Sequence, residues 1–383
     1  MSILKSNPVY VVGIGMHRYQ FPSETPYVQL GLTAAREALS DARISWAQVP
    51  LAVVGTAAIG MAAGRVMLRH LGSTGFEVMQ VENASASGST AFRTACLQVA
   101  AGEHDVALAL GVDKFGDGRR ASSKDGLQPL SPTANIPLVN FALLTRQLMR
   151  DHGLTAEDLA RVAVKNHGNA ALNPYAQFRK PRTLEQVLAS PRIAGALTGM
   201  MCTPRGEGAA AVIVASDAGI ERLGLDHKRA VRVLSSVSSS ERLAEDAPLG
   251  VPPIVELVRH TSQAALQQAG LPAAALDLIE LHDAFSIEEL VYAEAIGACA
   301  AGDAAGALAR GEWAIGGRCA VNASGGLIGM GHPLGPTGIG QIAEIARQLR
   351  GEATGRQHPG ARTGMAHMIG LGTMAVAHVL HKE

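Results

Sequence analysis

The chain has 383 residues, of which 47% are hydrophobic and 17% are charged, with 33 basic and 33 acidic side chains. This length exceeds one ordinary core, so it predicts two domains or a duplicated fold. The balanced charge and the aromatic content of 4% argue against nucleic-acid binding, and no apolar run is long enough to be a transmembrane helix.

The four cysteines are Cys96, Cys202, Cys299 and Cys319, and they show neither CxxC nor Cys/His spacing. This pattern predicts a reducing compartment and no metal site. The first six residues lack the apolar segment of a signal peptide. We therefore expect a cytoplasmic protein without a membrane partner.

Strands and helices alternate along the first part of the chain. The apolar patterns predict strands over 9–15, 51–55, 76–81 and 106–111, and helices over 27–42, 61–71 and 89–101. This alternation predicts a layered α/β architecture.

From about Asp113 to Pro137 the sequence becomes polar and carries Gly and Pro. Three cations in it, Arg119, Arg120 and Lys124, could face an anionic ligand, although a solvated loop is the simpler interpretation. Helices are predicted over 139–151, 155–171 and 184–188, before the strand 209–216.

The second half faintly repeats the first. A similar apolar pattern at 38–44 and 265–271 leads into a strand, and a strand ends in Asn-Ala-Ser at 83–85 and again at 322–324. Such a repeat predicts two similar α/β halves with a site at their junction. The expected division is 1–116 for the first part of the N-terminal half, 117–205 for an inserted, mostly helical loop domain, 206–225 for the returning strand and 226–383 for the C-terminal half.

The stretch 81–91 (VENASASGSTA) joins a predicted strand to a predicted helix through small residues. The first N–H groups of a helix are unpaired and the helix dipole favours negative charge there, which suits a nucleophile or an oxyanion hole. We expect this turn to present Ser85. The alternative is that Ser85 and Ser87 only cap the helix.

Two histidines lie at predicted strand-to-helix junctions. His282 belongs to HDAF (282–285) and His332 to GHPLG (331–335), while His367 lies between two apolar runs. Histidines held near glycines and backbone N–H groups are accessible to a ligand. Each of them taken alone could equally be structural.

Together these stretches resemble the thiolase superfamily, and most closely its sterol-carrier-protein-type (SCP2-type), acetyl-CoA acetyltransferase-like branch. The resemblance covers nearly the whole chain and depends on the order of its motifs. It implies two βαβαβαββ halves in a five-layered α/β/α/β/α fold, usually a homodimer. The matching stretches are 9–15, 81–91, 107–111, 164–167, 173–178, 202–204, 208–210, 282–285, 331–335 and 367–372.

The resemblance implies thiolytic cleavage or Claisen condensation of a β-ketoacyl-CoA, with coenzyme A as cosubstrate and no tightly bound cofactor. It places Ser85 at the position of the nucleophilic cysteine and His332 beside it as the activating base. His282 would donate a hydrogen bond to the thioester oxygen of the enolate. The N–H groups of Ser85 and Gly372 would form a second oxyanion hole, and His367 occupies a family position.

The resemblance also implies residues that contact the acyl-CoA. These are Cys202, Thr203, Pro204, Phe285 and Met330.

Two residues depart from the family pattern. Ser85 stands where the family has cysteine, and a hydroxyl is a much weaker nucleophile than a partly ionised thiol. Ala284 stands where SCP2-type thiolases commonly carry the cysteine that acts as acid and base. No cysteine of the chain matches either position, so the usual two-thiol mechanism cannot run in this sequence.

Three explanations follow. The chain is a thiolase in which serine was substituted for cysteine to trap a complex, or a natural retro-aldolase that cleaves a β-hydroxyacyl-CoA, or a non-catalytic acyl-CoA-binding subunit. Retro-aldolases of thiolase type work with a small OB-fold/zinc-ribbon partner subunit and use tyrosines, of which only Tyr292 lies near a motif here. A serine hydrolase is disfavoured because 83–87 lacks the glycines of a nucleophile elbow.

Overall fold

The computed structural model of the chain describes residues 2–115, 136–241, 253–371 and 374–383. The three cations of the polar segment, Arg119, Arg120 and Lys124, and the expected oxyanion-hole residue Gly372 lie outside these ranges.

The strands and helices predicted for the first 216 residues are present, with bounds that differ by a few residues. The strand expected over 9–15 continues to Gln20, and the helix expected from 89 begins at Ser87. The strands are β1 (Val9–Gln20), β2 (Leu51–Gly55), β3 (Glu77–Val81), β4 (Val106–Asp113), β5 (Arg192–Ala194), β6 (Leu197–Thr198), β7 (Glu207–Ser216), β8 (Val231–Ser240), β9 (Leu278–Glu280), β10 (Ala320–Val321), β11 (Thr363–Gly370) and β12 (Met374–His381). The helices are α1 (Ile3–Ser6), α2 (Tyr27–Ala42), α3 (Ala63–Leu68), α4 (Ser87–Ala101), α5 (Ile136–His152), α6 (Ala156–Ala171), α7 (Leu184–Leu188), α8 (Asp217–Leu223), α9 (Pro253–Ala269), α10 (Ser286–Ile296), α11 (Ala304–Ala309), α12 (Gly326–Gly329) and α13 (Thr337–Arg350).

The large sheet shows the duplication directly. Its order is β10-β9-β11-β12-β8-β1-β7-β4-β2-β3, which divides at the β8–β1 contact into two five-stranded halves. In the first half β2 is parallel to β3 and β4, and β7 is antiparallel to β4 and β1. In the second half β9 is parallel to β10 and β11, and β12 is antiparallel to β11 and β8. Both halves therefore have the same topology.

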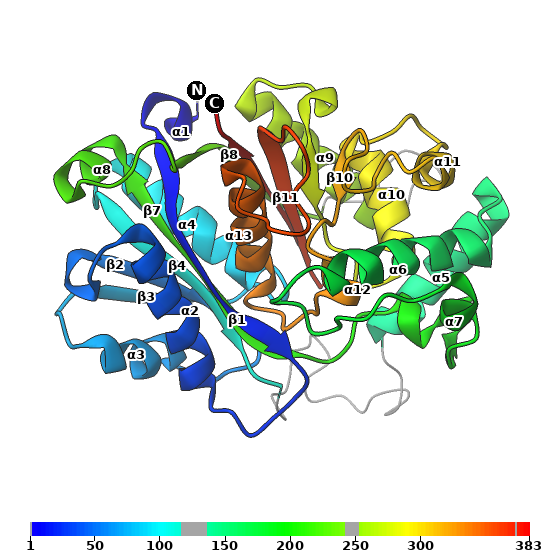
Figure 1. Cartoon of the computed structure of the whole chain (residues 1–383), viewed down its shortest axis with the longest axis horizontal. Coiled ribbons are helices and arrows are strands. Elements are labelled where there is room, and N and C mark those ends of the chain that lie inside the picture. The colour runs from blue at the N-terminus through cyan, green and yellow to red at the C-terminus, as the bar shows by residue number, and fades with distance from the viewer. Residues whose placement is uncertain (1, 116–135, 242–252, 372–373) are drawn as a thin grey trace.

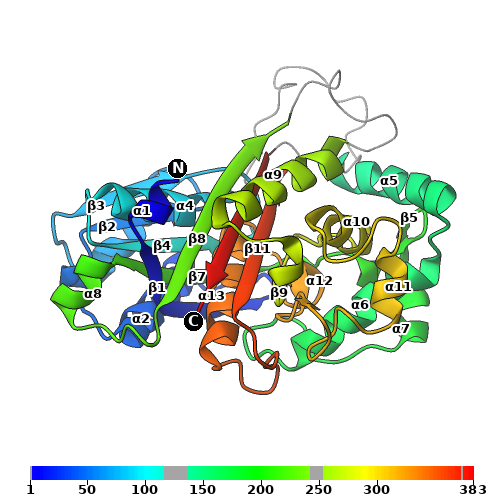
Figure 2. The same ribbon diagram turned by 90° about the horizontal axis from the view of Figure 1, so that it is seen from above.

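Helices α4 and α13 occupy equivalent places in the two halves, because each follows the edge strand of its half. They pack against each other, and α13 contacts strands of both halves, so these helices form a central layer (Figure 1). Helix α2 covers the outer face of the first half and α9 covers that of the second (Figure 2). The result is the expected five-layered α/β/α/β/α fold.

Sequence patterns explain these layers. Strand β4 is buried along its whole length, as expected for a strand with helices on both faces. Helix α2 buries a stripe of apolar residues three or four positions apart and ends at Arg43, which has a left-handed φ of 58°.

Helices α5, α6 and α7 lie between β4 and β7 in sequence and beside α10–α12 in space (Figure 1). Helix α6 begins with a capping box formed by Thr155 and Asp158. The division of the chain at 116, 205 and 225 is still our proposal.

The two halves approach each other most closely at glycine residues, which have no side chain. A Cβ added at Gly88 would lie 2.2 Å from the backbone oxygen of Gly335, and one added at Gly111 would lie 2.5 Å from the same oxygen. Backbone oxygens cannot move aside as a flexible side chain can. Contact between the halves therefore depends on these glycines.

We predict that Gly88→Ala lowers the free energy of unfolding by about 2 kcal/mol, because the new methyl group clashes with the Gly335 backbone. Gly168→Ala in α6 is the matched control, since a Cβ there meets no atom within 4 Å, and it should be neutral or stabilising. Urea unfolding of both variants measures the difference. Equal stability of the two variants would contradict the proposed contact.

Two buried imidazoles make stability depend on pH. Burial lowers the pKa of His367 and of His378 to about 3, with smaller contributions from His282 and from Arg93 respectively. The ordinary value is 6.5. Both rings are therefore neutral in the folded and unfolded states above pH 6.5. Below that pH the unfolded chain binds protons that the folded chain does not, so stability falls.

We predict that each of these rings lowers stability by about 2 kcal/mol when the pH falls from 7 to 5. In His378→Gln the pH-dependent loss should shrink by that amount, because this side chain does not titrate. Denaturant unfolding at several pH values tests this, and parallel stability curves for the two proteins would refute it.

Candidate active site

Ser85 lies in the turn between β3 and α4. Helix α4 begins at Ser87, and its N-cap residue Ala86 offers no side-chain cap. The Ser87 hydroxyl instead accepts from the Asn83 N–H and donates to the Ala84 oxygen. The capping interpretation of Ser85 and Ser87 was therefore wrong, and the Ser85 hydroxyl points to another group.

The Ser85 hydroxyl faces the imidazole of His332. The Ser85 Oγ lies 3.1 Å from the Nε2 of His332, and the Nδ1 of His332 lies 2.9 Å from the Oγ1 of Thr337, the first residue of α13. Both Ser85 and His332 are more than 90% buried. A hydroxyl from the first half thus meets an imidazole from the second.

His282 faces the same place. Its ring centroid lies 5.3 Å from that of His332, and the two rings are nearly perpendicular. Its Nδ1 lies 3.1 Å from the Oε1 of Glu288, which also accepts from the Tyr292 hydroxyl at 3.1 Å. The other oxygen of Glu288 accepts from the Phe285 N–H. Glu288 thereby fixes the orientation of His282.

Strained backbone gathers in the loops of this site. Among the described residues, six that are not glycine have positive φ. Two of these, Ala84 and Leu334, lie in the turns that carry Ser85 and His332. Asn322 lies in the second Asn-Ala-Ser stretch, and Leu371 precedes position 372. Such strain concentrates at functional sites, where the surrounding structure maintains it.

Asp113 holds the His332 loop against the first half. Its buried carboxylate accepts from the Thr56 hydroxyl at 2.6 Å, from the Gly335 N–H at 2.7 Å, and from the N–H groups of Ala57 and Ala58. Burial raises the pKa of Asp113 above its usual value, and these hydrogen bonds offset only part of that rise. One carboxylate therefore ties together the ends of β2 and β4 and the turn that carries His332.

A buried polar network supports the HDAF segment. Asp283 accepts from Asn166 at 2.8 Å and from the Leu327 N–H at 2.6 Å, and Glu289 accepts from Asn166 at 2.7 Å. Lys165 pairs with Glu289 at 3.1 Å. Burial and the nearby charge of Glu289 raise the pKa of Asp283. Helix α6 is thus joined to the start of α10 and to α12.

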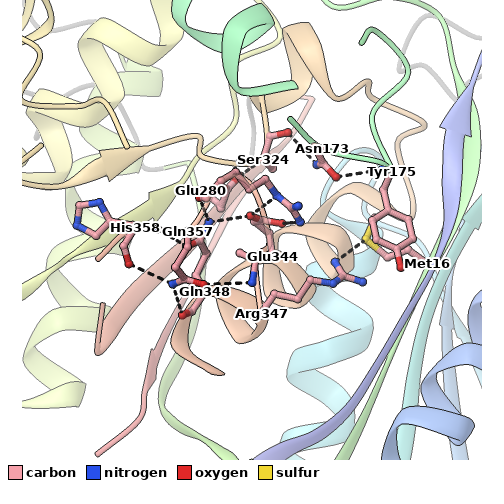
Figure 3. Close-up of polar contacts among 12 residues, drawn as sticks. Met16, Asn173, Tyr175, Glu280, Ser324, Glu344, Arg347, Gln348, Gln357 and His358 are labelled. Atoms are coloured by element: carbon pink, nitrogen blue, oxygen red, sulfur yellow. Dashed lines mark hydrogen bonds and ion pairs between the residues drawn. The ribbon is translucent and has the colours of Figure 1, made fainter. Parts of the chain in front are cut away.

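The second Asn-Ala-Ser turn is anchored by Glu280. Figure 3 shows Ser324 between Glu280 and Asn173; its hydroxyl and N–H both reach the Glu280 carboxyl group, and its oxygen accepts from Asn173. Burial and the negative charge of Glu344 raise the pKa of Glu280 to about 8. Glu344 itself is paired with the buried Arg356 at 2.7 Å.

The segment expected to contact an acyl-CoA lies beside HDAF. The Thr203 N–H donates to the Ala284 oxygen at 2.8 Å, and Cys202 forms a β-bridge with Phe285. The Phe285 ring stacks on Phe141 of α5 at 4.8 Å. Burial raises the pKa of the Cys202 thiol to about 12, so this cysteine does not supply a thiolate.

Two further expected residues lie deeper. The Met330 side chain packs in a hydrophobic cluster to which both halves contribute, and its backbone oxygen accepts from the Gln177 N–H. His367 is fully buried in β11, 5.8 Å from the Tyr292 ring, and neither ring nitrogen has a hydrogen-bond partner within the described ranges. Pro204 follows Thr203 in the segment beside HDAF.

The sequence did not identify Glu288, Thr337 or Asp113 as site residues. Glu288 and Thr337 lie six and five positions after the histidines they contact, at the starts of α10 and α13. A search for polar side chains in the first turn of the helix that follows each histidine would have found both. Asp113 lies two residues beyond the predicted strand 106–111 and ends β4 in the structure. Nothing in the sequence indicates which loop it contacts.

Comparisons with known proteins give matches over most of the chain. The family model described as "Thiolase, N-terminal domain" matches residues 10–186, and the one described as "Thiolase C-terminal domain-like" matches residues 251–382. Sterol carrier protein 2 of Gallus gallus is 36% identical over 386 residues, which cover 96% of this chain and 70% of that protein. The chain belongs to the thiolase family.

Two other relatives of this thiolase-family chain are named for their chemistry, and both are 33% identical. Benzoylsuccinyl-CoA thiolase subunit BbsB of Thauera aromatica matches over 96% of each chain. Acetyl-CoA acetyltransferase of Methanothermobacter thermautotrophicus matches over 98% of this chain and 99% of that one. The thiolase-family chain is therefore acetyltransferase-like in its general kind.

Solved structures share the fold. The Ltp2-ChsH2(DUF35) aldolase superposes with a TM-score of 0.85 at 24% identity, and human mitochondrial 3-ketoacyl-CoA thiolase in complex with CoA superposes with a TM-score of 0.76 at 17% identity. Each match covers 98% of both chains. In the described part of this thiolase-family chain, no helix has the length and apolar character needed to cross a membrane.

Proposed function

We propose that the chain binds an acyl-CoA and makes or breaks the bond between its α- and β-carbons through a thioester enolate. The contact of 3.1 Å between Ser85 and His332, with the His282 ring 5.3 Å from that of His332, carries this proposal. A base on one side and a hydrogen-bond donor on the other are what an enolate reaction needs. The relatives named as thiolase and acetyl-CoA acetyltransferase support a CoA thioester as substrate.

Glu288 decides what His282 can do. A neutral imidazole has one N–H, so with Nδ1 facing Glu288 the Nε2 can donate to a thioester oxygen only when the ring carries both protons. The Nδ1 of His282 lies 3.1 Å from the Oε1 of Glu288, which leaves the opposite ring nitrogen, Nε2, available to a ligand. We therefore assign Glu288 the role of orienting His282 so that its Nε2 can face the enolate oxygen.

His332 is the proposed base. When its Nδ1–H donates to Thr337, its Nε2 can accept the proton of residue 85. Serine hydrolases place a carboxylate behind the imidazole to stabilise the imidazolium, and Thr337 offers only a hydroxyl. A hydroxyl stabilises an imidazolium less than a carboxylate does, so His332 would activate a serine poorly. It would suffice for a thiol, which ionises more easily.

With cysteine at position 85 the site would carry out thiolysis. The thiol of residue 85 would give its proton to His332 as the sulfur attacks the β-carbonyl carbon. The bond between the α- and β-carbons would then break, and its electron pair would form the enolate, which would take the proton from His332 at the α-carbon and leave as one CoA thioester. The thiol of a second CoA would next displace the acyl group from residue 85, its proton passing through His332 to the released sulfur, to give the shortened acyl-CoA.

Retro-aldol cleavage of a β-hydroxyacyl-CoA is a second candidate for the chain with Ser85. His332 would take the proton of the β-hydroxyl group, the same carbon–carbon bond would break, a carbonyl product would leave and the enolate would be protonated. Ala284 and the weak support behind His332 favour this route, as does the fold shared with the Ltp2-ChsH2(DUF35) aldolase. Tyr292 is a poor acid or base for it, because burial and Glu288 raise its pKa.

We also propose how the substrate and partners are arranged. The CoA thiol end would lie beside the paired segments Cys202–Pro204 and Ala284–Phe285, where HDAF borders the inserted helices. The active form is a homodimer, alone or with a small OB-fold/zinc-ribbon partner subunit. The partner is supported by the names of two similar proteins: BbsB is called a subunit, and the Ltp2-ChsH2(DUF35) aldolase is named as a complex.

We predict that Ser85→Cys raises thiolysis of a β-ketoacyl-CoA by about a hundredfold or more, because a thiol replaces a weak nucleophile. Mass spectrometry of the CoA products measures this. Ser85→Ala is the control and should match the wild type if the serine is not a nucleophile. Negligible thiolysis by Ser85→Cys, together with cleavage of a β-hydroxyacyl-CoA by the wild type, would reject the thiolase reaction and support the retro-aldol one.

We predict that Glu288→Gln lowers kcat by about 10²–10³-fold with little change in KM, because the amide no longer orients the His282 ring toward the enolate oxygen as the carboxylate does. Tyr292→Phe is the control, since it removes a hydrogen bond to Glu288 and keeps the charge, so its effect should be much smaller. The measurement is the pH profile of kcat for all three proteins. An equal loss of kcat in both variants would show that Glu288 contributes only to packing around His282.

A further inference from the structure

A second concave site lies away from the three proposed catalytic side chains. Arg18 at the end of β1 and the connection from α6 to α7 line a hollow of about 670 Å³. Figure 1 shows these two segments near each other, and the Tyr19 N–H donates to the Tyr175 oxygen. Cations predominate among the lining residues, which are Arg18, Ala171, Gln177, Phe178, Arg179, Lys180 and Arg182.

The four cations are not neutralised. No carboxylate lines the hollow, and none of the four forms an ion pair with any described Asp or Glu. The Nε of Arg182 is buried and has no acceptor among the described residues. Because the whole chain has equal numbers of acidic and basic residues, this concentration of positive charge is local.

The fold holds these cations in place. The Gln177 N–H donates to the Met330 oxygen at 2.8 Å, and the Phe178 N–H donates to the Gly329 oxygen at 3.2 Å. The Nε of Arg18 donates to the Ala176 oxygen, and the Phe178 ring packs edge-on against Phe21 and His167. Like charges held together on a fixed backbone repel one another unless an anion lies between them.

We propose that this hollow binds a small phosphorylated molecule through its phosphoryl groups. The guanidinium groups of arginine match the oxygens of a phosphate with paired hydrogen bonds, and the lysine adds a point charge. A hollow of this size lies within the usual range for small-molecule sites. Its wall adjoins the His332 loop, since a Cβ at Gly331 would lie 2.7 Å from the side-chain oxygen of Gln177.

The phosphoryl groups could belong to a free metabolite or to the nucleotide end of CoA. The probe is inorganic pyrophosphate, titrated into the full chain by calorimetry at about 0.15 M salt, where long-range attraction is screened. We expect saturable binding to the wild type and a loss of affinity of about tenfold or more in Arg179→Ala/Lys180→Ala. Both residues are exposed, so the fold should survive.

The control Arg65→Ala/Lys228→Ala removes the same charge from exposed residues elsewhere and should bind pyrophosphate as the wild type does. Absence of saturable binding to the wild type, or an equal loss in the control, would overturn the proposal. If CoA displaces pyrophosphate, the occupant is the nucleotide end of CoA. If both bind together, the occupant is a free phosphorylated metabolite, and the site is independent of the proposed reaction.

Discussion

Direct backbone contact between the two halves is the constraint on which the site depends. The first turn of α4, the end of β4 and the loop before α13 approach one another so closely that Gly88, Gly111 and Gly335 leave no room for a side chain. Ser85 lies three residues before Gly88, and His332 lies three residues before Gly335. The glycine contacts therefore set the distance between hydroxyl and imidazole, and Asp113 fixes the same loop through the Gly335 N–H.

The two histidines of the site have different partners, and this difference separates their chemistry. The Nδ1 of His282 faces the carboxylate of Glu288, which orients the ring so that Nε2 can stabilise a developing oxyanion. The Nδ1 of His332 faces the hydroxyl of Thr337, and its Nε2 faces Ser85, from which it can accept a proton. An enolate reaction needs an oxyanion stabiliser and a base, whereas serine hydrolases place the carboxylate behind the base.

The sequence predicted most of the fold because local patterns determine it. The alternating strands and helices, the repeated Asn-Ala-Ser turns and the apolar stripe of α2 indicated two similar halves, and the strand order is the same in both. Ser85, His282 and His332 could be named because each lies at a strand-to-helix junction. The interpretation of Ser85 as a cap failed because Ser87 bonds the backbone before the helix.

The partners of these residues could not be predicted in the same way. Asp113 contacts a loop more than two hundred positions later in the chain, and that pairing is a product of tertiary packing. The hollow lined by Arg18 and Arg179–Arg182 likewise joins distant segments. Glu288 is only six positions from His282 in sequence, yet its role follows only from the distance of 3.1 Å between its Oε1 and the Nδ1 of the ring.

The most direct test of the central claim is a crystal structure with a non-hydrolysable acyl-CoA analogue bound. The proposal predicts that the atom replacing the thioester oxygen lies within hydrogen-bond distance of the His282 Nε2, with the α- and β-carbons between Ser85 and His332. An analogue that is bound with its acyl group away from these three side chains would contradict the claim.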